Sequence, residues 1–286
     1  MLGHMAVRVL SKEHDVIGTT RSAVMETNGL SRFLESDKWI GNIDVRKLED
    51  LTKLVNRVKP DVILNCVGLV KQKMTSLTYI ESIEINALLP HRLAQICEDS
   101  NSRLIQISTD CVFGCEPGVK SQFTEPDSKD LYGRTKLLGE VTYGSALTLR
   151  TSIVGRQLSG DESLFEWIIN QRNGSVNGYQ NARYTGLTTQ ALAEVILKII
   201  SEHHHLRGLW QVASEEISKY QLVEQLNQIL DLGITLRSDT EFNCDRRLDG
   251  NPFERETGII TPSWKAMLQS FAADQVNYEN KEIGRP

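Results

Sequence analysis

The chain has 286 residues, of which 40% are hydrophobic and 24% are charged, and its formal net charge is −5. A chain of this length can bury a substantial core, as one large domain or two smaller ones. The acidic balance argues against a nucleic-acid partner, which requires a basic surface. No apolar run approaches the roughly 18 residues that cross a bilayer, and no signal peptide is recognisable at the start. We therefore expect a cytoplasmic protein with no membrane partner.

The cysteines are odd in number and lack the closely spaced pairs of a metal site, so they predict reduced thiols and no bound metal. They are Cys66, Cys97, Cys111, Cys115 and Cys244. The run of three histidines at 203–205 also suggests a metal at first sight. It stands where a helical pattern ends, and imidazoles are favourable there because of the helix dipole alone.

Short β-branched runs alternate with longer helical patterns in the first half of the chain. The predicted strands are 16–20, 39–43, 61–67, 103–108 and 146–150, and the predicted helices are 48–58, 82–100 and 132–141. The run 61–67 is continuously apolar, as expected for a parallel strand covered on both faces. This alternation is typical of a parallel α/β sheet built from right-handed crossover units.

The regular alternation weakens after about residue 155. Residues 174–178 predict a turn-rich interruption, 209–213 a strand, and 188–200 and 218–230 helices, the first capped by Thr188 or Thr189. We expect a main domain over 1–155, a smaller lobe over 156–275 and a flexible tail over 276–286.

Tyr132 and Lys136 form a Tyr-x3-Lys pair on a predicted helix, where residues four apart project from the same face. A nearby ammonium lowers the pKa of a phenol from about 10 toward working pH. Such a tyrosine can protonate a carbonyl that receives hydride. The alternative is an ordinary surface pair on an amphipathic helix. Ser108 and Thr109 end a predicted strand earlier in the chain and could hold the carbonyl beside the tyrosine.

Together with its surroundings, this pattern resembles the extended short-chain dehydrogenase/reductase superfamily and, more closely, the dTDP-4-dehydrorhamnose reductase family. The stretches that carry the resemblance are ISTDCVF at 107–113, FTE at 123–125, DLYGRTKLLGE at 130–140, LRTS at 149–152 and GLWQVA at 208–213. The resemblance covers nearly the whole chain. It implies a Rossmann-like doubly wound parallel sheet with a smaller α/β substrate-binding lobe.

The resemblance also implies an activity. It is the reduction by NADPH, with NADH as the alternative cofactor, of a nucleotide-activated 4-keto deoxysugar for dTDP-rhamnose or a related surface-polysaccharide sugar. A homodimer is expected from the resemblance alone. A UDP-linked keto sugar with reductase or epimerase chemistry is an alternative, since the same catalytic residues would serve. A non-catalytic, nucleotide-binding regulatory subunit is another.

The resemblance assigns catalytic roles only where residues match the family pattern. Thr109 would hydrogen-bond the sugar carbonyl, and Tyr132 would deliver the proton. Lys136 would bind the nicotinamide ribose and tune the tyrosine. Asn86 would support the active-site hydrogen bonds, unless it is a solvated polar residue of its helix. Ser108 competes with Thr109 but points to the opposite face of its strand.

Several residues are candidates for cofactor binding. Thr20 and Arg21 follow the second strand of the family scheme, where an NAD-selective fold carries a carboxylate. A hydroxyl and a guanidinium suit a 2′-phosphate instead, which favours NADPH. Asp44 would contact the adenine amine, or would cap the next helix. The remaining candidates lie at strand ends: Asn65, Cys66, Val67 and Thr151.

The resemblance places the substrate around the ends of the later strands and in the second lobe. The candidates are Asp110, Cys111, Val112, Ser152 and Arg183, although Arg183 could simply be solvated. Tyr184 and Thr185, which follow Arg183, are further candidates for contact with the pyrophosphate or the sugar. The segment 70–79, with Lys71 and Lys73, could lie over the sugar.

The opening residues MLGHMAVRVL match the end of a glycine-rich loop and the helix that follows it. Gly3 would be the last glycine of that loop, which allows close packing of helix against strand. We therefore expect a chain whose first strand and earlier loop glycines are missing, and which binds dinucleotide weakly or is poorly stable.

Overall fold

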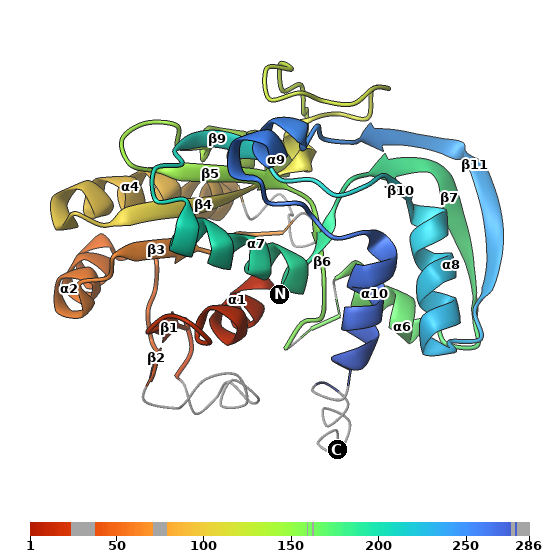
Figure 1. Ribbon diagram of the computed structural model, residues 1–286, viewed down its shortest axis with the longest axis horizontal. Helices are drawn as coiled ribbons and strands as arrows, with labels where there is room; N and C mark the ends of the chain where they lie inside the picture. The colour runs from red at the N-terminus through yellow and green to blue at the C-terminus, as the bar shows by residue number, and fades with distance from the viewer. Residues whose placement is uncertain (24–37, 71–78, 159, 162, 276–277, 279–286) are drawn as a thin grey trace.

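The computed structural model describes residues 1–23, 38–70, 79–158, 160–161, 163–275 and 278 (Figure 1). Its central sheet is parallel and has the strand order β3 (Val62–Asn65), β4 (Arg103–Thr109), β5 (Leu147–Thr151) and β9 (Gly208–Gln211). Thr109 pairs with Thr151, so the carboxyl ends of β4 and β5 lie side by side. The prediction of a parallel α/β sheet is confirmed.

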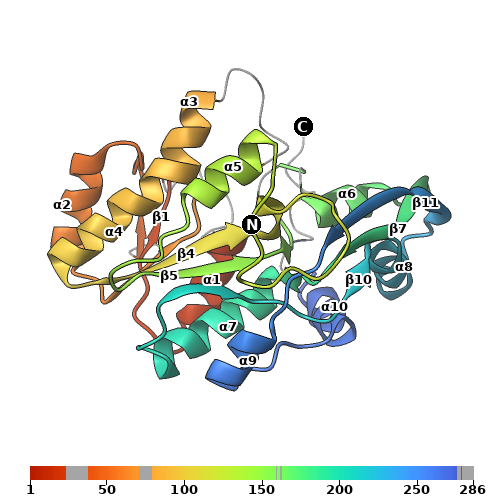
Figure 2. The same cartoon turned by 90° about the horizontal axis from the view of Figure 1, so that it is seen from above.

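Helices cover both faces of this sheet, as Figure 2 shows. On one face lie α2 (Leu48–Val58), α4 (Leu89–Ser100) and α5 (Leu131–Leu138), and on the other α1 (Leu2–Leu10) and α7 (Thr189–Glu202). Apolar stripes on α7 and α4 fill the core against the strands. A separate parallel pair, β1 (Gly18–Thr19) with β2 (Trp39–Ile40), adjoins α1.

The helix predicted over 82–100 is interrupted. A short α3 (Tyr79–Ser82) leads into a π-helical segment, Ile83–Leu88, before α4 begins. Asn86 lies in the π-helical segment and is 1% exposed. π-helical turns are rare and are frequent at functional sites. A periodicity of 3.6 residues cannot reveal one extra residue in a turn, so the sequence predicted a regular helix here.

The second lobe is built on β7 (Ser175–Tyr184), which lies between antiparallel β10 (Ile217–Ser218) and parallel β11 (Thr235–Arg246). Around it stand α6 (Leu164–Asn170), α8 (Lys219–Leu230) and α10 (Trp264–Ala273) (Figure 1). The prediction of a turn-rich interruption at 174–178 holds only for Gly174, which ends a turn, and is wrong for 175–178, which begin β7. Gly178 is needed within the strand, since a Cβ there would lie 2.7 Å from the Tyr220 ring and 2.8 Å from Leu236.

The two lobes are joined in several places. The short pair β6 (Ile153–Val154) with β8 (Leu187–Thr188) links the end of β5 to the start of α7, and α9 (Asn251–Thr257) packs against β9. Although they follow residue 155, α7 and β9 belong to the layers of the central sheet. The chain therefore passes between the two lobes more than once. The division into functional domains at residue 155 stays a prediction.

A disulfide also ties the segment after β4 to β11. It joins Cys115 to Cys244, whose Cα atoms are 4.2 Å apart. The prediction that all the cysteines are reduced is wrong for this pair, because 129 residues separate the partners and no sequence spacing brings them together. Cys66, Cys97 and Cys111 are free thiols. None of the helices in the described ranges is long and apolar enough to cross a bilayer.

Candidate active site

Thr109 and Ser108 point in different directions at the end of β4, as predicted. The Ser108 hydroxyl donates to Oε1 of Glu140 at 2.6 Å, within a buried ion pair. Oγ1 of Thr109 accepts from the backbone N–H of Cys111 at 3.1 Å and donates to Oδ1 of Asp110 at 3.2 Å. Ser108 is therefore held inside the protein, and Thr109 is the hydroxyl available at the carboxyl end of the sheet.

Tyr132 stands in the first turn of α5, which Asp130 caps by accepting from the N–H of Gly133 at 2.8 Å. Its pKa is raised, first by burial and then by the nearby Cys111 and Asp110, while a hydrogen-bonding interaction with Thr109 lowers it. The predicted lowering of this pKa by Lys136 is wrong in this structure, because desolvation of the phenolate dominates. The side chain stays a neutral phenol, which is the form that donates a proton.

Lys136 lies one turn along α5 and is 6% exposed. Its Nζ donates to the backbone carbonyl of Ile107 at 2.6 Å. Burial lowers the pKa of Lys136 to about 8, and Glu140 opposes the shift. An ammonium has three N–H donors, so two remain for a ligand. This is the donor set that a pair of ribose hydroxyls requires.

Asn86 connects the segment after β3 with α5. Its Oδ1 accepts from the N–H of Leu69 at 2.8 Å, and its Nδ2 donates to the Leu69 carbonyl at 3.1 Å and to Oγ1 of Thr135 at 3.4 Å. Thr135 in turn donates to the carbonyl of Leu131 at 2.8 Å. The alternative of a solvated helix residue is therefore wrong, and Asn86 holds the helix that carries Tyr132.

Arg150 and Glu140 form a buried ion pair beneath the site. Nε and Nη2 of Arg150 donate to the two oxygens of Glu140 at 2.9 and 2.6 Å, and the side chains are 3% and 6% exposed. The guanidinium also stacks 5.0 Å above the Phe113 ring. Glu140 follows the end of α5, so this pair fixes the end of that helix against β5, and the bond from Ser108 fixes it against β4. It was not predicted from the sequence, because nothing in the spacing of the two residues marks them as partners.

At the end of β3, the predicted cofactor residues fix the backbone. Nδ2 of Asn65 donates to Oε1 of Gln106 at 2.7 Å, and its Oδ1 accepts from the N–H of Val67 at 3.0 Å. Burial raises the pKa of the Cys66 thiol to about 12. A Cβ on Gly3 would lie 3.6 Å from Cys66, an ordinary contact, so the expected steric requirement for glycine is absent at that position.

The predicted adenosine-side residues lie after β1 and β2. Thr20 donates to the carbonyl of Ser22 at 2.7 Å, and Arg21 is exposed without an ion-pair partner among the described residues. Asp44 accepts from Nε and Nη2 of Arg46 at 3.0 and 2.8 Å, and these bonds lower its pKa to about 2. The alternative of Asp44 as a helix cap is wrong, because Lys47 occupies the cap position of α2.

The structure separates the predicted substrate residues. Asp110 is buried and Cys111 partly exposed beside Thr109, whereas Val112 is fully buried in an apolar cluster with Phe113 and Leu248. The assignment of Val112 to substrate binding is corrected to a packing role, since its side chain has no exposed surface.

Thr151 and Ser152 lie at the end of β5. Thr151 is 2% exposed, and the Ser152 carbonyl accepts from the N–H of Leu187 at 2.8 Å. Arg183 is exposed and lies 3.5 Å from Glu216, so its contact with substrate stays a prediction. Lys71, Lys73 and most of 70–79 fall outside the described residues, as does the tail 276–286 except for Tyr278.

The second lobe adds Lys219 and Arg246, which were not predicted from the sequence, beside the predicted Tyr184. Nζ of Lys219 lies 3.8 Å from the centre of the Tyr184 ring, and Nη1 of Arg246 donates to Sγ of Cys111 at 3.1 Å. Burial lowers the pKa of Lys219 to about 8, and Asp110 opposes the shift. Arg183 and Tyr184 were both predicted to contact the substrate, but they lie on opposite faces of β7, with Arg183 exposed and Tyr184 buried.

The sequence matches a known protein family over nearly its whole length. The family model of the RmlD substrate-binding domain matches residues 1–276. The chain belongs to this family. A probable low-salt glycan biosynthesis reductase of Haloferax volcanii is 28% identical over 160 residues, 54% of this chain and 50% of that protein. The dTDP-4-dehydrorhamnose reductase of Mycobacterium tuberculosis is 31% identical over 103 residues, 33% of this chain and 34% of that protein. The matches thus span half or less of these curated relatives.

Solved structures share the fold of this RmlD-family chain. A dTDP-4-dehydrorhamnose reductase of Bacillus anthracis in complex with NADP has a TM-score of 0.73 at 18% identity, covering 90% of this chain and 98% of that one. A dTDP-glucose 4,6-dehydratase of the same organism, in complex with NAD, has a TM-score of 0.78 at 15% identity, covering 99% and 94%. The Rossmann-like architecture is therefore confirmed.

Proposed function

We propose that this chain is an NADPH-dependent reductase of a nucleotide-activated 4-keto deoxysugar, acting in the synthesis of dTDP-rhamnose or a related sugar. The observation that carries the proposal is the meeting of Thr109 and Tyr132 at the carboxyl end of β4, with the buried ammonium of Lys136 one turn away. Open α/β folds bind their ligands at this edge of the sheet. Membership of the RmlD substrate-binding domain family supports the same activity.

The residues on the cofactor side fit a reduced nicotinamide dinucleotide. The two uncommitted N–H donors of Lys136 suit ribose hydroxyls, and the exposed Arg21 suits a 2′-phosphate. Asp44 would accept from the adenine amine, and Asn65, Cys66, Val67, Gly3, Thr20 and Thr151 would line the path of the cofactor. When bound, the dinucleotide supplies a hydride to the keto carbon.

The chain itself orients the carbonyl and moves one proton. The Thr109 hydroxyl exchanges its hydrogen bond to Asp110 for one to the carbonyl oxygen, because it has a single proton to donate. Tyr132 transfers its phenolic proton to that oxygen as negative charge develops on it. Burial keeps Tyr132 protonated before the reaction, so it acts as the acid. Asn86, the Arg150–Glu140 pair and the Asp130 cap hold α5 so that the hydroxyl stays near Thr109.

Expressed protein, supplied with NADPH and a dTDP-linked 4-keto-6-deoxyhexose, tests the proposal. We expect oxidation of NADPH that depends on the sugar, followed by the absorbance of the nicotinamide. UDP-linked keto sugars in the same assay distinguish the alternative substrate class. NADPH binding with no turnover on either class would contradict the proposal and favour a regulatory subunit.

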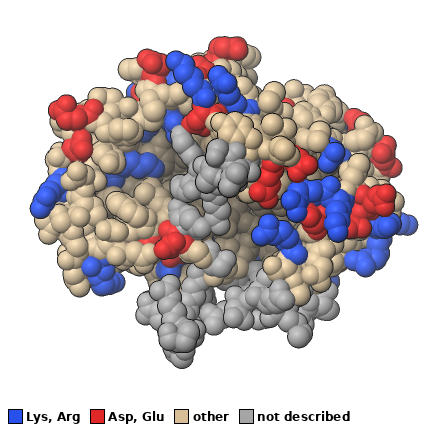
Figure 3. Space-filling view, turned by 180° about the vertical axis from the view of Figure 1, so that it is seen from behind, with Lys and Arg blue, Asp and Glu red and all other residues tan. Residues whose placement is uncertain are grey.

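The expected partners and location are also proposals. Acidic and basic side chains are intermixed on the face in Figure 3, and together with the net charge of −5 this supports the absence of a nucleic-acid partner. We propose a cytoplasmic homodimer on the family resemblance. Light scattering during size-exclusion chromatography measures the oligomeric state directly.

A further inference from the structure

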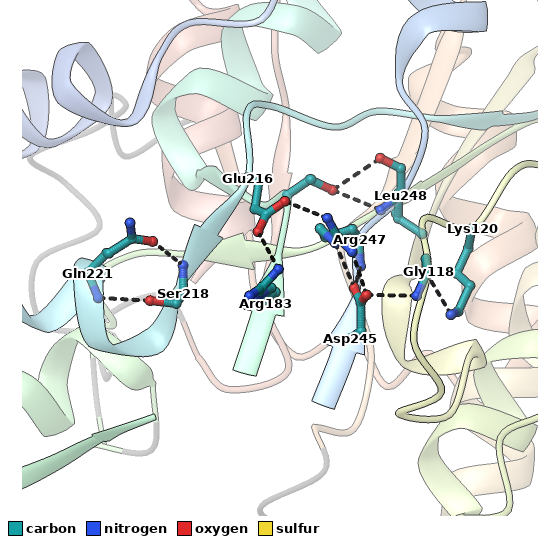
Figure 4. Close-up of polar contacts among 10 residues, drawn as sticks. Gly118, Lys120, Arg183, Glu216, Ser218, Gln221, Asp245, Arg247 and Leu248 are labelled. Atoms are coloured by element: carbon teal, nitrogen blue, oxygen red, sulfur yellow. Dashed lines mark hydrogen bonds and ion pairs between the residues drawn. The ribbon is translucent and has the colours of Figure 1, made fainter. Parts of the chain in front are cut away.

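The loop 114–120, which follows β4, is fastened to the end of β11 in the second lobe. Its Cys115 forms the disulfide with Cys244. The Cys115 carbonyl accepts from the N–H of Asp245 at 3.2 Å, and Oδ2 of Asp245 accepts from the N–H of Gly118 at 2.8 Å. Figure 4 shows Asp245 reaching Gly118 of the loop. The disulfide is therefore one contact in a short interface between the two lobes.

Lys120 anchors the other end of this loop without any contribution from the disulfide. Its N–H donates to the carbonyl of Arg247 at 2.7 Å, and its carbonyl accepts from the N–H of Asp249 at 2.9 Å. Its ammonium donates to the carbonyl of Gly118 at 2.8 Å, so the loop is also bonded to itself (Figure 4). We therefore expect the loop to keep its fold when the disulfide is open, while its hold on β11 becomes weaker.

The disulfide lies where a reductant can reach it. Cys115 is exposed and Cys244 is partly exposed, whereas Cys97 is 1% exposed. Thiol–disulfide exchange requires a thiolate to approach one of the two sulfur atoms, so an exposed disulfide is the kind that is reduced reversibly. Cys111 does not serve as that thiolate, because burial raises its pKa to about 12. An external thiol is therefore required to open the disulfide.

Both ends of this link stand beside the candidate active site. On the β4 side, the loop follows Thr109 and Cys111 in the chain. On the β11 side, Cys244 precedes Arg246 by two residues, so both side chains lie on the same face of the strand. Nη1 of Arg246 donates to Sγ of Cys111 at 3.1 Å. The disulfide thus joins the strand that carries the Thr109 hydroxyl to the second lobe, across 129 residues of sequence.

The proposed cytoplasmic location decides what kind of disulfide this is. Thiols are kept reduced in that compartment, and the disulfides found there are mostly transient or redox-sensing. An exposed disulfide in such surroundings opens and closes with the balance of thiols and disulfides around the protein.

We propose that the Cys115–Cys244 disulfide is a redox-sensitive link between the two lobes, opened by a dithiol and re-formed by the oxidised dithiol. In opening, the dithiol gives up two electrons and two protons and becomes a disulfide, the S–S bond of the protein breaks, and both cysteines become thiols. With the link open, the end of β11 is held less firmly and the second lobe closes less firmly over the sugar. The effect on the sugar rests on the proposed function, while the opening of the link does not.

Dithiothreitol and its oxidised form, applied to the full chain, test the proposal. Alkylation followed by peptide mass spectrometry should find Cys115 and Cys244 modified after reduction and protected after oxidation. Opening a cross-link between residues so far apart in sequence frees the unfolded chain, so the melting temperature should fall by about 10 °C. KM for the keto sugar should rise by about fivefold, because the second lobe must then be ordered on binding. The dissociation constant for NADPH should change by less than about twofold, since the cofactor residues lie in the other lobe.

Cysteine variants separate the link from other effects of the reductant. Cys115→Ser and Cys244→Ser should each behave as the reduced chain does and should show no further response to dithiothreitol. Cys97→Ala is the matched control, because Cys97 is a free thiol in the apolar cluster that α2 and α4 share. It should keep the full response to dithiothreitol in melting temperature and in KM.

The outcomes distinguish this inference from the proposed function. The inference is overturned, and the reductase stands, if Cys115 and Cys244 stay reactive after oxidation or stay protected from dithiothreitol in the folded chain. It is also overturned if the link opens without changing KM for the sugar, because the disulfide is then only structural. If the melting temperature responds to dithiothreitol but neither form reduces a keto sugar, the proposed function is overturned, together with the effect of the link on the sugar.

Discussion

Gly133, between Tyr132 and Lys136 on α5, leaves no room for a side chain. A Cβ on Gly133 would lie well inside 3.0 Å of three atoms, the backbone carbonyl oxygen of Cys111 and both Oγ and Cβ of Ser128. A change of rotamer moves Oγ of the serine but not its Cβ, and the carbonyl belongs to the turn that follows Thr109. In Gly133→Ala, α5 and this turn must therefore move apart.

The size of the effect follows from two opposing contributions. Replacing glycine by alanine inside a helix stabilises it by about 1 kcal/mol. Forcing a methyl group into a packed site costs about 1–3 kcal/mol. We expect the clash to dominate, with a net loss of about 1 kcal/mol of unfolding free energy. Separating Tyr132 from Thr109 by roughly 1 Å should lower kcat by about a hundredfold.

Urea denaturation and the NADPH oxidation assay measure the two effects on purified Gly133→Ala. Leu138→Ala is the control, because Leu138 lies on the same helix and is 65% exposed. It should retain kcat within about twofold, in line with a surface substitution. A Gly133→Ala protein as stable and as active as the unmodified chain would refute the close packing of α5 on Cys111.

Three further predictions concern stability and positioning. Arg150→Met should lower the free energy of unfolding, measured in urea, by about 3–5 kcal/mol, because it leaves the buried carboxylate of Glu140 without a counter-charge. A loss below about 1 kcal/mol, typical of an exposed ion pair, would contradict the claim that this pair is buried. Asn86→Ala should lower kcat more than it raises KM for the sugar, because it frees α5 without removing a substrate contact. If the variant instead lost affinity for NADPH and for the sugar equally, with kcat unchanged, the positioning role of Asn86 would be refuted. The pKa of Asp245 is lowered to about 2 by its bonds to Arg247 and Gly118, against burial. This pKa is lower in the folded state than the usual value of about 3.9. The ionised carboxylate therefore stabilises the fold above about pH 4, and this stabilisation is lost as the pH falls toward 2. Asp245→Asn should remove that part of the dependence of unfolding free energy on acid pH, and an unchanged dependence would refute the prediction.

The residues of α5 and β4 were predictable because their chemistry depends on short-range geometry. Tyr132 and Lys136 are four residues apart on one helix, and Ser108 and Thr109 are adjacent on one strand. Helical and strand periodicity alone place these side chains on their faces. The family resemblance then assigned their roles.

The sign of the Tyr132 pKa shift was not predictable, because it depends on burial rather than on spacing. Desolvation of the buried phenol outweighs the effect expected from Lys136. The disulfide between Cys115 and Cys244 could not be predicted for a related reason, since only the packing of β11 beside the segment after β4 brings the two thiols together.

The part of the site that the second lobe contributes was the least predictable. Tyr184, Lys219 and Arg246 come from three separate elements of that lobe, and no motif links them. Arg183 and Tyr184 were both candidates, and only the strand pairing of β7 places Arg183 outward and Tyr184 inward. The glycine and asparagine residues of β7 are typical of turns, so the sequence did not indicate a strand there. The pairing with β11 shows that the segment is extended.

The central claim is that Tyr132 supplies the proton for a reduction that NADPH drives. The most direct measurement compares Tyr132→Phe with the unmodified chain for single-turnover reduction of the keto sugar and for NADPH affinity. We predict a rate at least about a hundredfold lower, as is typical when a general acid is removed, with the dissociation constant for NADPH unchanged within twofold. A Tyr132→Phe protein that reduces the sugar at the unmodified rate would contradict the account.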